Sequence, residues 1–327
     1  MKKKVKAVAP YIYKGVLNFK NKPFEAWREM GLPTVKGWYP RVLHKLMFNV
    51  DVPTLWHGEA RLVFVQPVSL YFDTFFTALT HEMIPFIWDC WPCYYDKTEK
   101  WLKRHNVKTA IFTARQEMEE IKRRIPELNV VWCPEAVDTS LYGEGKELKD
   151  RSIDLLEFGR GIDFNVNDRK CNVNDHENDA VFSKIKHVRT LVDGKFIYTE
   201  EQLRDAMGDA KVTICLPRSV THPDMAEGVE TLTQRYWEAM LPRMVIIGHS
   251  PQELIDLIGY NPVASPSPSS RGDVDYIDYV NYVLAHIEDY QELVNKNRET
   301  ALKMGDWKER IGFCQKELIL LGYNVKS

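Results

Sequence analysis

Two glutamates eight residues apart are the strongest candidates for chemistry in this chain. Glu230 and Glu238 are joined by the sequence Thr-Leu-Thr-Gln-Arg-Tyr-Trp, and an apolar run that ends at Gly248 follows them. A helix over residues 231–241 would place Glu230 at its start and Glu238 about two turns inside it, roughly 12 Å along the axis. Because a carboxylate accepts two hydrogen bonds from a vicinal diol, the pair suits the sugar and ribose hydroxyls of a nucleotide-sugar.

The diphosphate of such a ligand would lie between the two carboxylates. The N–H groups near Thr231, Leu232 and Thr233 would face it with the positive end of the helix dipole, so no metal ion is required. Spacing alone favours a structural role for both glutamates. Glu238 would then be an ion-paired helix residue, and Glu230 an acid that the dipole stabilises at the helix start.

Other patterns carry less chemistry. Cys90-Trp-Pro-Cys93 has the spacing of a redox dithiol or half a zinc site, but no second pair completes four ligands, so a packed turn is favoured. Residues 165–179 are rich in Asn and Asp, yet Lys170 occupies a ligand position of the calcium-loop pattern, and we expect a solvated loop. The chain lacks a P-loop, and neither of its G-x-G triplets has the third glycine of a dinucleotide-binding site.

Composition narrows the class of protein. The chain has 327 residues, of which 28% are charged and 44% hydrophobic, and this is enough for two globular domains. Lys and Arg number 44 against 46 Asp and Glu, a net charge of −2, which argues against a nucleic-acid partner. No apolar stretch approaches the roughly 20 residues that cross a bilayer, and no signal-peptide pattern is present. We expect a cytoplasmic protein.

The elements that must position these residues alternate between strands and helices. In the first half, strands are predicted over 5–9, 62–65, 85–88, 108–112 and 129–133, with helices over 68–82, 96–105 and 114–124. The pattern restarts after a polar run at 142–150, with strands over 153–158, 195–198, 212–216 and 244–247 and helices over 200–207, 231–241 and 251–258. The chain is helical again from 274 onward. This alternation predicts an α/β protein with two successive domains.

Five segments, in chain order, resemble glycosyltransferase family 4, the retaining GT-B enzymes of bacterial glycan assembly. Residues 230–248 resemble the E-(x)7-E region, whose Glu-Ala-Met frame selects Glu230 rather than Glu227 as its first acid. The other four are the first strand of the nucleotide-binding domain ending in Gly159-Arg160, the interdomain turn at 131–139, the first-domain loop at 84–92 and the start of the last helix at 304–310. The resemblance covers the chain from about residue 60 to the C-terminus.

The resemblance implies a GT-B architecture, with two Rossmann-like domains facing across a cleft. Residues 1–140 would form the acceptor-side domain and 141–305 the nucleotide-sugar-binding domain, while a helix over about 306–327 would cross back to the first. The implied reaction transfers a sugar from a nucleotide diphosphate to a hydroxyl acceptor with retention of configuration, and it needs neither a cofactor nor a metal. The acceptor would be a glycan or a lipid-linked glycan.

The resemblance also assigns roles to residues. Glu230 and Asp89 would be catalytic, although Asp89 is equally plausible as a turn-capping aspartate. The donor would be bound by Glu238, Arg160, Thr231, Leu232 and Thr233, with its base near Ile197 and Tyr198.

Two family residues are missing from this chain. Asn165 stands at the position of the second basic phosphate ligand, for which Arg169 or Lys170 might substitute, and the first-domain histidine is replaced by Trp88 or Asp89. A catalytically silent nucleotide-sugar-binding or scaffold protein with the same fold is therefore the alternative.

Basic residues accumulate at the N-terminus. Residues 1–60 hold eleven lysines and arginines against four acids, interleaved with aromatic side chains. Such a segment could form a surface for an anionic membrane, at the inner face of the cytoplasmic membrane, where a lipid-linked acceptor would lie. A solvated charged face with the aromatic residues in the core is the alternative, and charge runs favour it.

Overall fold

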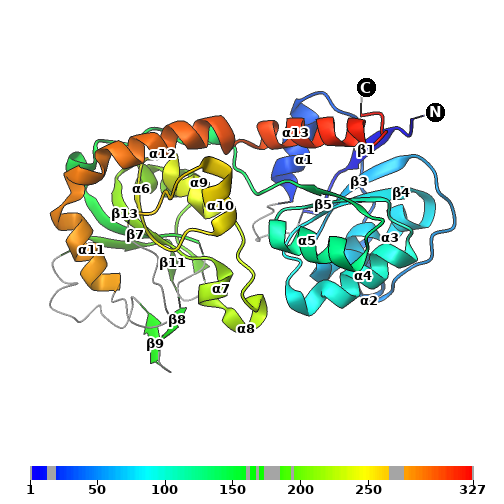
Figure 1. Ribbon diagram of the computed structural model, residues 1–327, viewed down its shortest axis with the longest axis horizontal. Helices are drawn as coiled ribbons and strands as arrows, with labels where there is room; N and C mark the ends of the chain where they lie inside the picture. Colours follow the sequence, from blue (N-terminus) through cyan, green and yellow to red (C-terminus); the bar gives the residue numbers. More distant parts are fainter. Residues whose placement is uncertain are drawn as a thin grey trace. The chain divides into compact units, whose positions relative to one another are not determined.

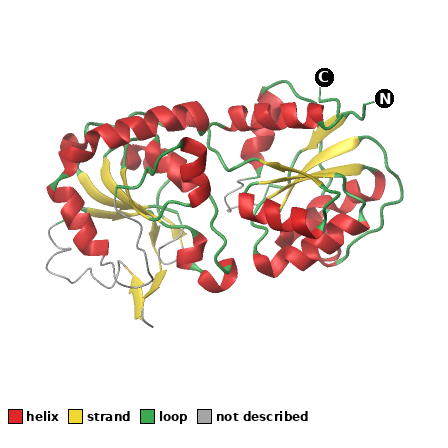
Figure 2. Ribbon diagram, in the orientation of Figure 1, coloured by secondary structure: helices red, strands yellow, loops and turns green. Residues whose placement is uncertain are grey.

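The protein divides into two compact α/β units. We describe a computed structural model over residues 2–12, 20–159, 163–166, 169–172, 185–192, 195–264 and 276–325 (Figures 1 and 2). Unit 1 comprises Met1–Glu135 with Trp307–Ser327, and unit 2 comprises Ala136–Asp306. Within the described ranges, we find no helix with the length and apolarity needed to span a bilayer.

Unit 1 is built on a parallel sheet with the strand order β2-β1-β3-β4-β5-β6. Its strands are β1 (Val5–Val8), β2 (Thr34–Val35), β3 (Ala60–Val65), β4 (Glu82–Ile87), β5 (Thr109–Phe112) and β6 (Asn129–Trp132). Its helices are α1 (Asn21–Glu29), α2 (His44–Asn49), α3 (Leu70–Thr80), α4 (Tyr95–Arg104), α5 (Arg115–Arg124) and α13 (Trp307–Leu320), with short 3₁₀ turns at η1 (Arg41–Leu43), η2 (Pro67–Ser69) and η3 (Pro92–Tyr94).

Helices cover both faces of this sheet. Figure 1 shows α1 and α13 on one side and α3, α4 and α5 on the other. Accordingly all four residues of β5 are buried, as expected for a central parallel strand. The last helix packs on unit 1 through one face, because its buried residues Trp307, Ile311, Cys314 and Leu318 recur at helical spacing. The chain therefore returns to its first unit at its end, as the resemblance implies.

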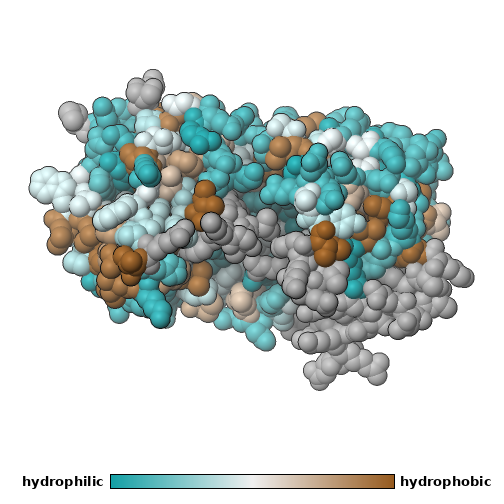
Figure 3. Space-filling model, turned by 180° about the vertical axis from the view of Figure 1, so that it is seen from behind, coloured by the Kyte–Doolittle hydropathy of each residue, from teal (hydrophilic) through white to brown (hydrophobic). Residues whose placement is uncertain are grey.

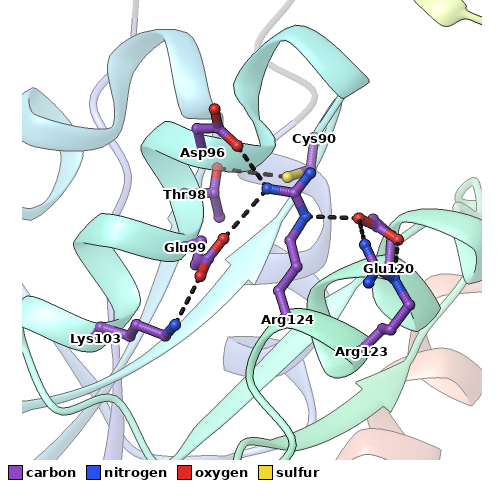
Figure 4. Close-up of polar contacts among 8 residues, drawn as sticks. All are labelled: Cys90, Asp96, Thr98, Glu99, Lys103, Glu120, Arg123 and Arg124. Atoms are coloured by element: carbon purple, nitrogen blue, oxygen red, sulfur yellow. Dashed lines mark hydrogen bonds and ion pairs between the residues drawn. The ribbon is translucent and has the colours of Figure 1, made fainter.

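Charged side chains join α4 to α5 at the surface of unit 1 (Figure 4). The guanidinium of Arg124 donates to Asp96 at 2.6 Å and to Glu99 at 3.2 Å, both on α4. It also donates to Glu120 on its own helix at 2.6 Å. The hydrogen bond from Arg123 and the second from Arg124 lower the pKa of Glu120 to about 2. This network is a stabilising contact between two helices that cover the same face of the sheet.

The Cys-x-x-Cys segment is a packed turn. Cys90 is buried and its Sγ lies 3.5 Å from the hydroxyl of Thr98, whereas Cys93 is exposed on η3. Burial raises the pKa of the Cys90 thiol well above its ordinary value. A redox dithiol needs a thiolate at ordinary pH, so this environment argues against that role.

Unit 2 has a parallel sheet with the order β10-β7-β13-β14 and two short antiparallel hairpins, β8–β9 and β11–β12. Its strands are β7 (Ile153–Glu157), β8 (Asp163–Val166), β9 (Arg169–Asn172), β10 (His187–Arg189), β11 (Leu191–Val192), β12 (Lys195–Phe196), β13 (Ala210–Cys215) and β14 (Val245–Gly248). Its helices are α6 (Glu200–Gly208), α7 (Arg218–Thr221), α8 (Pro223–Ala226), α9 (Gln234–Met240), α10 (Gln252–Ile258), α11 (Tyr276–Ala285) and α12 (Gln291–Met304), with 3₁₀ turns η4 (Thr139–Leu141), η5 (Leu148–Asp150) and η8 (Ile287–Tyr290).

Two expectations for unit 2 were wrong. The strand expected over 195–198 is a two-residue strand in the β11–β12 hairpin, and the fourth strand of the sheet is instead β10. Its sequence, His-Val-Arg, lacks the apolar run by which buried strands are found, and all three residues are half-buried. The segment expected to be a loop from 165 onward contains the antiparallel β8–β9 hairpin, while 173–179 lie outside the described residues.

Candidate functional site

The strand order of unit 2 marks where a ligand should bind. From β7 the chain moves to β10 on one side, and later to β13 and β14 on the other. The order therefore reverses between β7 and β13, and ligands of open α/β sheets bind outside the carboxyl ends of the strands at such a point. Three segments leave these ends, namely Gly159 after β7, Pro217 after β13 and His249 after β14.

The turn after β14 carries His249 and is held by backbone hydrogen bonds and a close backbone approach. Gly248 has φ of +125°, and a Cβ there would lie 2.2 Å from the carbonyl oxygen of Cys215, so only glycine fits. The next residue, His249, donates its backbone N–H to that same carbonyl at 3.1 Å. Its own carbonyl accepts the hydroxyl of Tyr236 at 2.5 Å. Both backbone groups of His249 are thus fixed to neighbouring elements.

This histidine holds Glu230. The Nε2 of His249 lies 2.6 Å from Oε1 of Glu230, and the two side chains are 22% and 25% exposed. The hydroxyl of Ser219, on the segment after β13, lies 3.5 Å from the same carboxylate oxygen. Glu230 is therefore oriented by residues that follow two different strands, and it stays accessible to a ligand in solvent.

The helix after Glu230 begins later than predicted. It starts at Gln234, so Thr231, Leu232 and Thr233 precede its first turn instead of forming it. A buried carboxylate engages this segment, because Glu253 in the first turn of α10 accepts the backbone N–H of Leu232. The expectation that this N–H faces a diphosphate from a helix start was wrong. The donor-binding role of the three residues remains a prediction.

Glu238 lies one turn inside α9 and is held by a tyrosine. Its Oε1 accepts the hydroxyl of Tyr142 at 3.1 Å. Burial raises the pKa of Glu238, while the Tyr142 hydrogen bond and the charge of Arg235 act in the opposite direction. A carboxylate at this place has one oxygen engaged by the protein and can direct the other to a ligand hydroxyl.

A cation that the sequence reasoning missed lies at the same edge. A Cβ at Gly159, where φ is +81°, would lie 2.8 Å from Nε and 3.0 Å from Nη2 of Arg235, so the guanidinium packs directly on the end of β7. Its charge lowers the pKa of Glu238 against the effect of burial. The spacing could have revealed it, because Arg235 and Glu238 are three residues apart in one helix.

The remaining predicted donor ligands are less constrained. Arg160 lies outside the described residues, and only the backbone of Asn165, Arg169 and Lys170 is described, in the β8–β9 hairpin. Ile197 is 56% exposed, and its N–H donates to the carbonyl of Thr190 at 2.9 Å, just beyond β10.

Because the N–H of Ile197 is bonded to Thr190, it is already engaged by the protein, and this weakens the idea that it reads a base edge. Tyr198 is half-buried and packs against the core of unit 2.

Asp89 occupies the corresponding edge of unit 1. It follows β4 with φ of +53°, and its carboxylate accepts the side-chain amide of Gln66, which follows β3, at 2.6 Å. Positive φ is costly for a non-glycine residue and often accompanies functional positions. The geometry fits both the acceptor-side role and the turn-capping role.

Possible metal ligands and surface pockets within the described residues also bear on where a ligand binds. The described part of the chain contains no group of three or more His, Cys, Asp or Glu side chains placed to hold a metal ion. A surface pocket of unit 2 is lined by residues that include Lys146, Arg204 and Asp209. It lies at the amino end of the sheet, since Asp209 directly precedes β13. Ligands of such sheets bind at the opposite edge, and we place the candidate site there.

Solved structures of similar architecture come from glycosyltransferases. HepE of Anabaena in complex with UDP matches at 9% identity and a TM-score of 0.57, covering 97% of this chain and 100% of that one. AviGT4, a glycosyltransferase involved in avilamycin A biosynthesis, matches at 12% identity and a TM-score of 0.54, covering 98% of each chain.

Sucrose-phosphate synthase from Thermosynechococcus elongatus matches at 12% identity and a TM-score of 0.54, covering 95% of this chain and 80% of that one. The chain has the GT-B fold. No protein-family model matches it, and no curated protein sequence does. The GT-B fold contains two Rossmann-like domains, which correspond here to the parallel sheets of unit 1 and unit 2.

Proposed function

We propose that this protein transfers a glycosyl group from a nucleoside diphosphate-sugar to a hydroxyl acceptor. The observation that carries the proposal is the placement of Glu230 beside His249, which follows β14, and of Arg235 beside Gly159, which follows β7. Glu238 lies close enough to Arg235 for the charge of Arg235 to lower its pKa. Two carboxylates and a cation are the groups that a sugar, a ribose and a diphosphate need. The same fold in a protein solved with UDP-glucose supports the choice of donor class.

Each residue has a distinct task in this proposal. Arg235, together with Arg160 of the Gly-Arg sequence, stabilises the diphosphate as negative charge develops on the leaving oxygen. Glu230 accepts hydrogen bonds from hydroxyls of the transferred sugar, and His249 keeps its carboxylate in place. Glu238 accepts a ribose hydroxyl with the oxygen that Tyr142 does not hold.

The chemical step follows family 4 in this proposal. The acceptor oxygen bonds to the anomeric carbon on the face from which the diphosphate leaves, so configuration is retained. The bond between that carbon and the diphosphate oxygen breaks, and the acceptor proton passes to the leaving phosphate. No protein nucleophile takes part. Asp89 orients the acceptor hydroxyl, and the acceptor is a glycan or a lipid-linked glycan at the inner face of the cytoplasmic membrane.

Metal independence is part of the proposal. Arginine side chains offset the charge of the diphosphate, which is the task a divalent ion performs in other transferases. We therefore expect EDTA to leave turnover unchanged. Activity that EDTA abolishes and manganese restores would contradict this point without affecting the donor site.

An assay of donor cleavage tests the proposal as a whole. Purified protein is incubated with a panel of radiolabelled nucleotide-sugars, with and without simple glycan acceptors, and release or transfer of the labelled sugar is counted. We expect cleavage of one donor above the blank, and a loss of that cleavage in Glu230→Ala. Donor binding without any cleavage would instead favour the catalytically silent binding protein.

A further inference from the structure

An exposed apolar surface runs along the outer side of α3 in unit 1. We call it the α3 surface and define it by six side chains that are between 41% and 93% exposed, namely Trp38, Val42, Leu46, Val50, Leu55 and Trp56. Hydrophobic side chains gather at the surface of unit 1 on the left of Figure 3. Isolated exposed apolar residues are ordinary, but contiguous groups of this kind mark interaction sites.

Contacts with a single face of α3 bring together segments that carry these side chains. Phe72, Phe76 and Leu79 lie on one side of that helix, because they are four and three residues apart. The ring centroid of Phe72 lies 4.8 Å from that of Phe48, and the ring centroid of Phe76 lies 4.3 Å from that of Trp38. The carbonyl of Leu79 accepts the backbone N–H groups of Leu55 and Trp56 at 2.9 and 3.1 Å. These contacts span roughly 10 Å of one helix face.

The charges along these segments have one sign. Between residues 30 and 58 the sequence contains one acid, Asp51, and α3 contains one, Asp73. Asp51 lies 3.3 Å from Nη1 of Arg104 and is 14% exposed. Asp73 is buried in an ion pair with Lys20 at 2.7 Å. Neither acid presents a carboxylate at the surface.

The lysines of the same segments point to solvent. Lys36 and Lys45 are both exposed. Other lysines of the first 60 residues have an acidic partner, because Lys3 pairs with Glu82 and Lys6 pairs with Glu59 at 3.0 Å. Lys45 belongs to α2 and Lys36 directly follows β2, so both are close in sequence to the apolar side chains of the α3 surface.

We propose that the α3 surface binds the surface of an anionic phospholipid bilayer. Trp38, Trp56 and the aliphatic side chains enter the headgroup region, where tryptophan is favoured, and Lys36 and Lys45 contact lipid phosphates. Tryptophan and aliphatic side chains beside lysines, with no exposed acid between residues 30 and 58 or on α3, match an anionic interface in both polarity and charge. The proposal does not depend on nucleotide-sugar binding.

Vesicle co-sedimentation of the full chain tests it. Wild type is mixed with phosphatidylcholine vesicles and with vesicles that contain phosphatidylglycerol, at low and high salt. We expect pelleting with the anionic vesicles, and a Lys36→Glu/Lys45→Glu variant should reduce partitioning by at least fivefold per lysine. Val42→Asp/Leu46→Asp should abolish pelleting at both salt concentrations, because it removes the apolar contribution.

The matched control is Leu320→Asp, which changes an apolar side chain that is 78% exposed on α13 of the same unit. It should pellet like wild type, and circular dichroism should show equal folding of all variants. Absence of wild-type pelleting with anionic vesicles overturns the proposal. So does equal pelleting of Val42→Asp/Leu46→Asp, or equal binding to neutral vesicles. Self-association that this variant abolishes, without vesicle binding, would identify a dimer interface instead.

Discussion

The two sheets of this protein share a topology but carry different side chains at their carboxyl edges. In unit 1 the strand order reverses between β1 and β3, and in unit 2 between β7 and β13. At the edge of unit 1, the charges of Lys20 and Asp73 pair with each other and are at most 7% exposed. At the edge of unit 2, Glu230 and His249 are about three times as exposed. The charged pair at the edge of unit 1 is buried, whereas the charged pair at the edge of unit 2 is partly exposed.

The backbone follows the same division. In unit 2 the close approach at Gly248 requires glycine and fixes the turn that carries His249. In unit 1 the segment after β4 carries a non-glycine residue, Asp89, at positive φ and ties it to Gln66. Our proposal therefore assigns donor binding to unit 2 and the acceptor side to unit 1. The predictions below are designed to break or sharpen that division.

The largest expected effect is on turnover. Glu230→Ala should lower kcat by roughly tenfold to a hundredfold while changing donor affinity little, because its hydrogen bonds to the sugar strengthen in the transition state and charge-assisted bonds are worth about 1.5–3 kcal/mol. Steady-state kinetics and donor titration on the same protein separate the two quantities. Glu227→Ala is the matched control, since it removes an exposed acid three residues away. Equal kinetics for both variants would show that the glutamate motif is accidental.

Donor affinity should depend on the cation at β7. Arg235→Ala should raise the donor Kd by roughly tenfold or more, because it removes a charge-assisted hydrogen bond to the diphosphate. Arg235→Lys should restore part of the donor affinity, because it keeps the charge. Isothermal titration calorimetry of both variants, with the donor and with its nucleoside diphosphate, measures these dissociation constants. Arg204→Ala, at the amino-end pocket of unit 2, is the control and should bind like wild type. An unchanged Kd for Arg235→Ala would remove the diphosphate role.

Glu238→Gln separates binding from stability. Replacing the carboxylate should weaken donor binding several-fold, because an amide oxygen is a poorer acceptor for a ribose hydroxyl. The free energy of unfolding, by contrast, should stay the same or increase. Burial raises the pKa of Glu238 above its ordinary 4.5, so the ionised form disfavours folding as pH rises. Thermal melts should show the variant at least as stable above pH 4.5, with the difference vanishing below it. A variant that is less stable at pH 7 would contradict this account.

The smallest effect concerns the α4–α5 network of unit 1. The pKa of Glu120 is lowered from 4.5 to about 2, so its ion pairs stabilise the fold above pH 4.5 and are lost as pH falls towards 2. Glu120→Gln should flatten this part of the acid-unfolding profile, more at low salt than at high salt, and leave donor affinity unchanged. A change in donor Kd would show that the two units are not divided as we describe.

The sequence predicts the strands with strong patterns and misses the weak ones. The runs that form β4, β5, β13 and β14 are mostly apolar, and the predicted strands overlap them to within a few residues. The polar strand β10 and the short helices α1 and α2 have no such signal. In the site, Glu230 and Glu238 are visible as a motif. The histidine that orients Glu230 is not, because its partner is nineteen residues away and contact depends on how two strands end.

Arg235 illustrates a second limit of sequence reasoning. Its spacing from Glu238 places both on one helix, but only the fold brings its guanidinium against Gly159, which follows β7 far earlier in the chain. The buried Glu253 likewise takes the N–H of Leu232 through a tertiary contact. Such contacts decide whether a helix start faces a ligand, and a pattern of residue types does not contain them.

Donor binding by unit 2 is the central claim, and a thermal-shift panel of nucleotide-sugars tests it most directly. A ligand at 100 times its dissociation constant adds about 2.7 kcal/mol of stability. We predict that at least one nucleoside diphosphate-sugar raises the melting temperature of wild type. The same donor at the same concentration should raise that of Arg235→Ala and Glu238→Gln much less, and that of Arg204→Ala fully. No shift with any nucleotide-sugar, or an equal shift in all four proteins, would contradict the account.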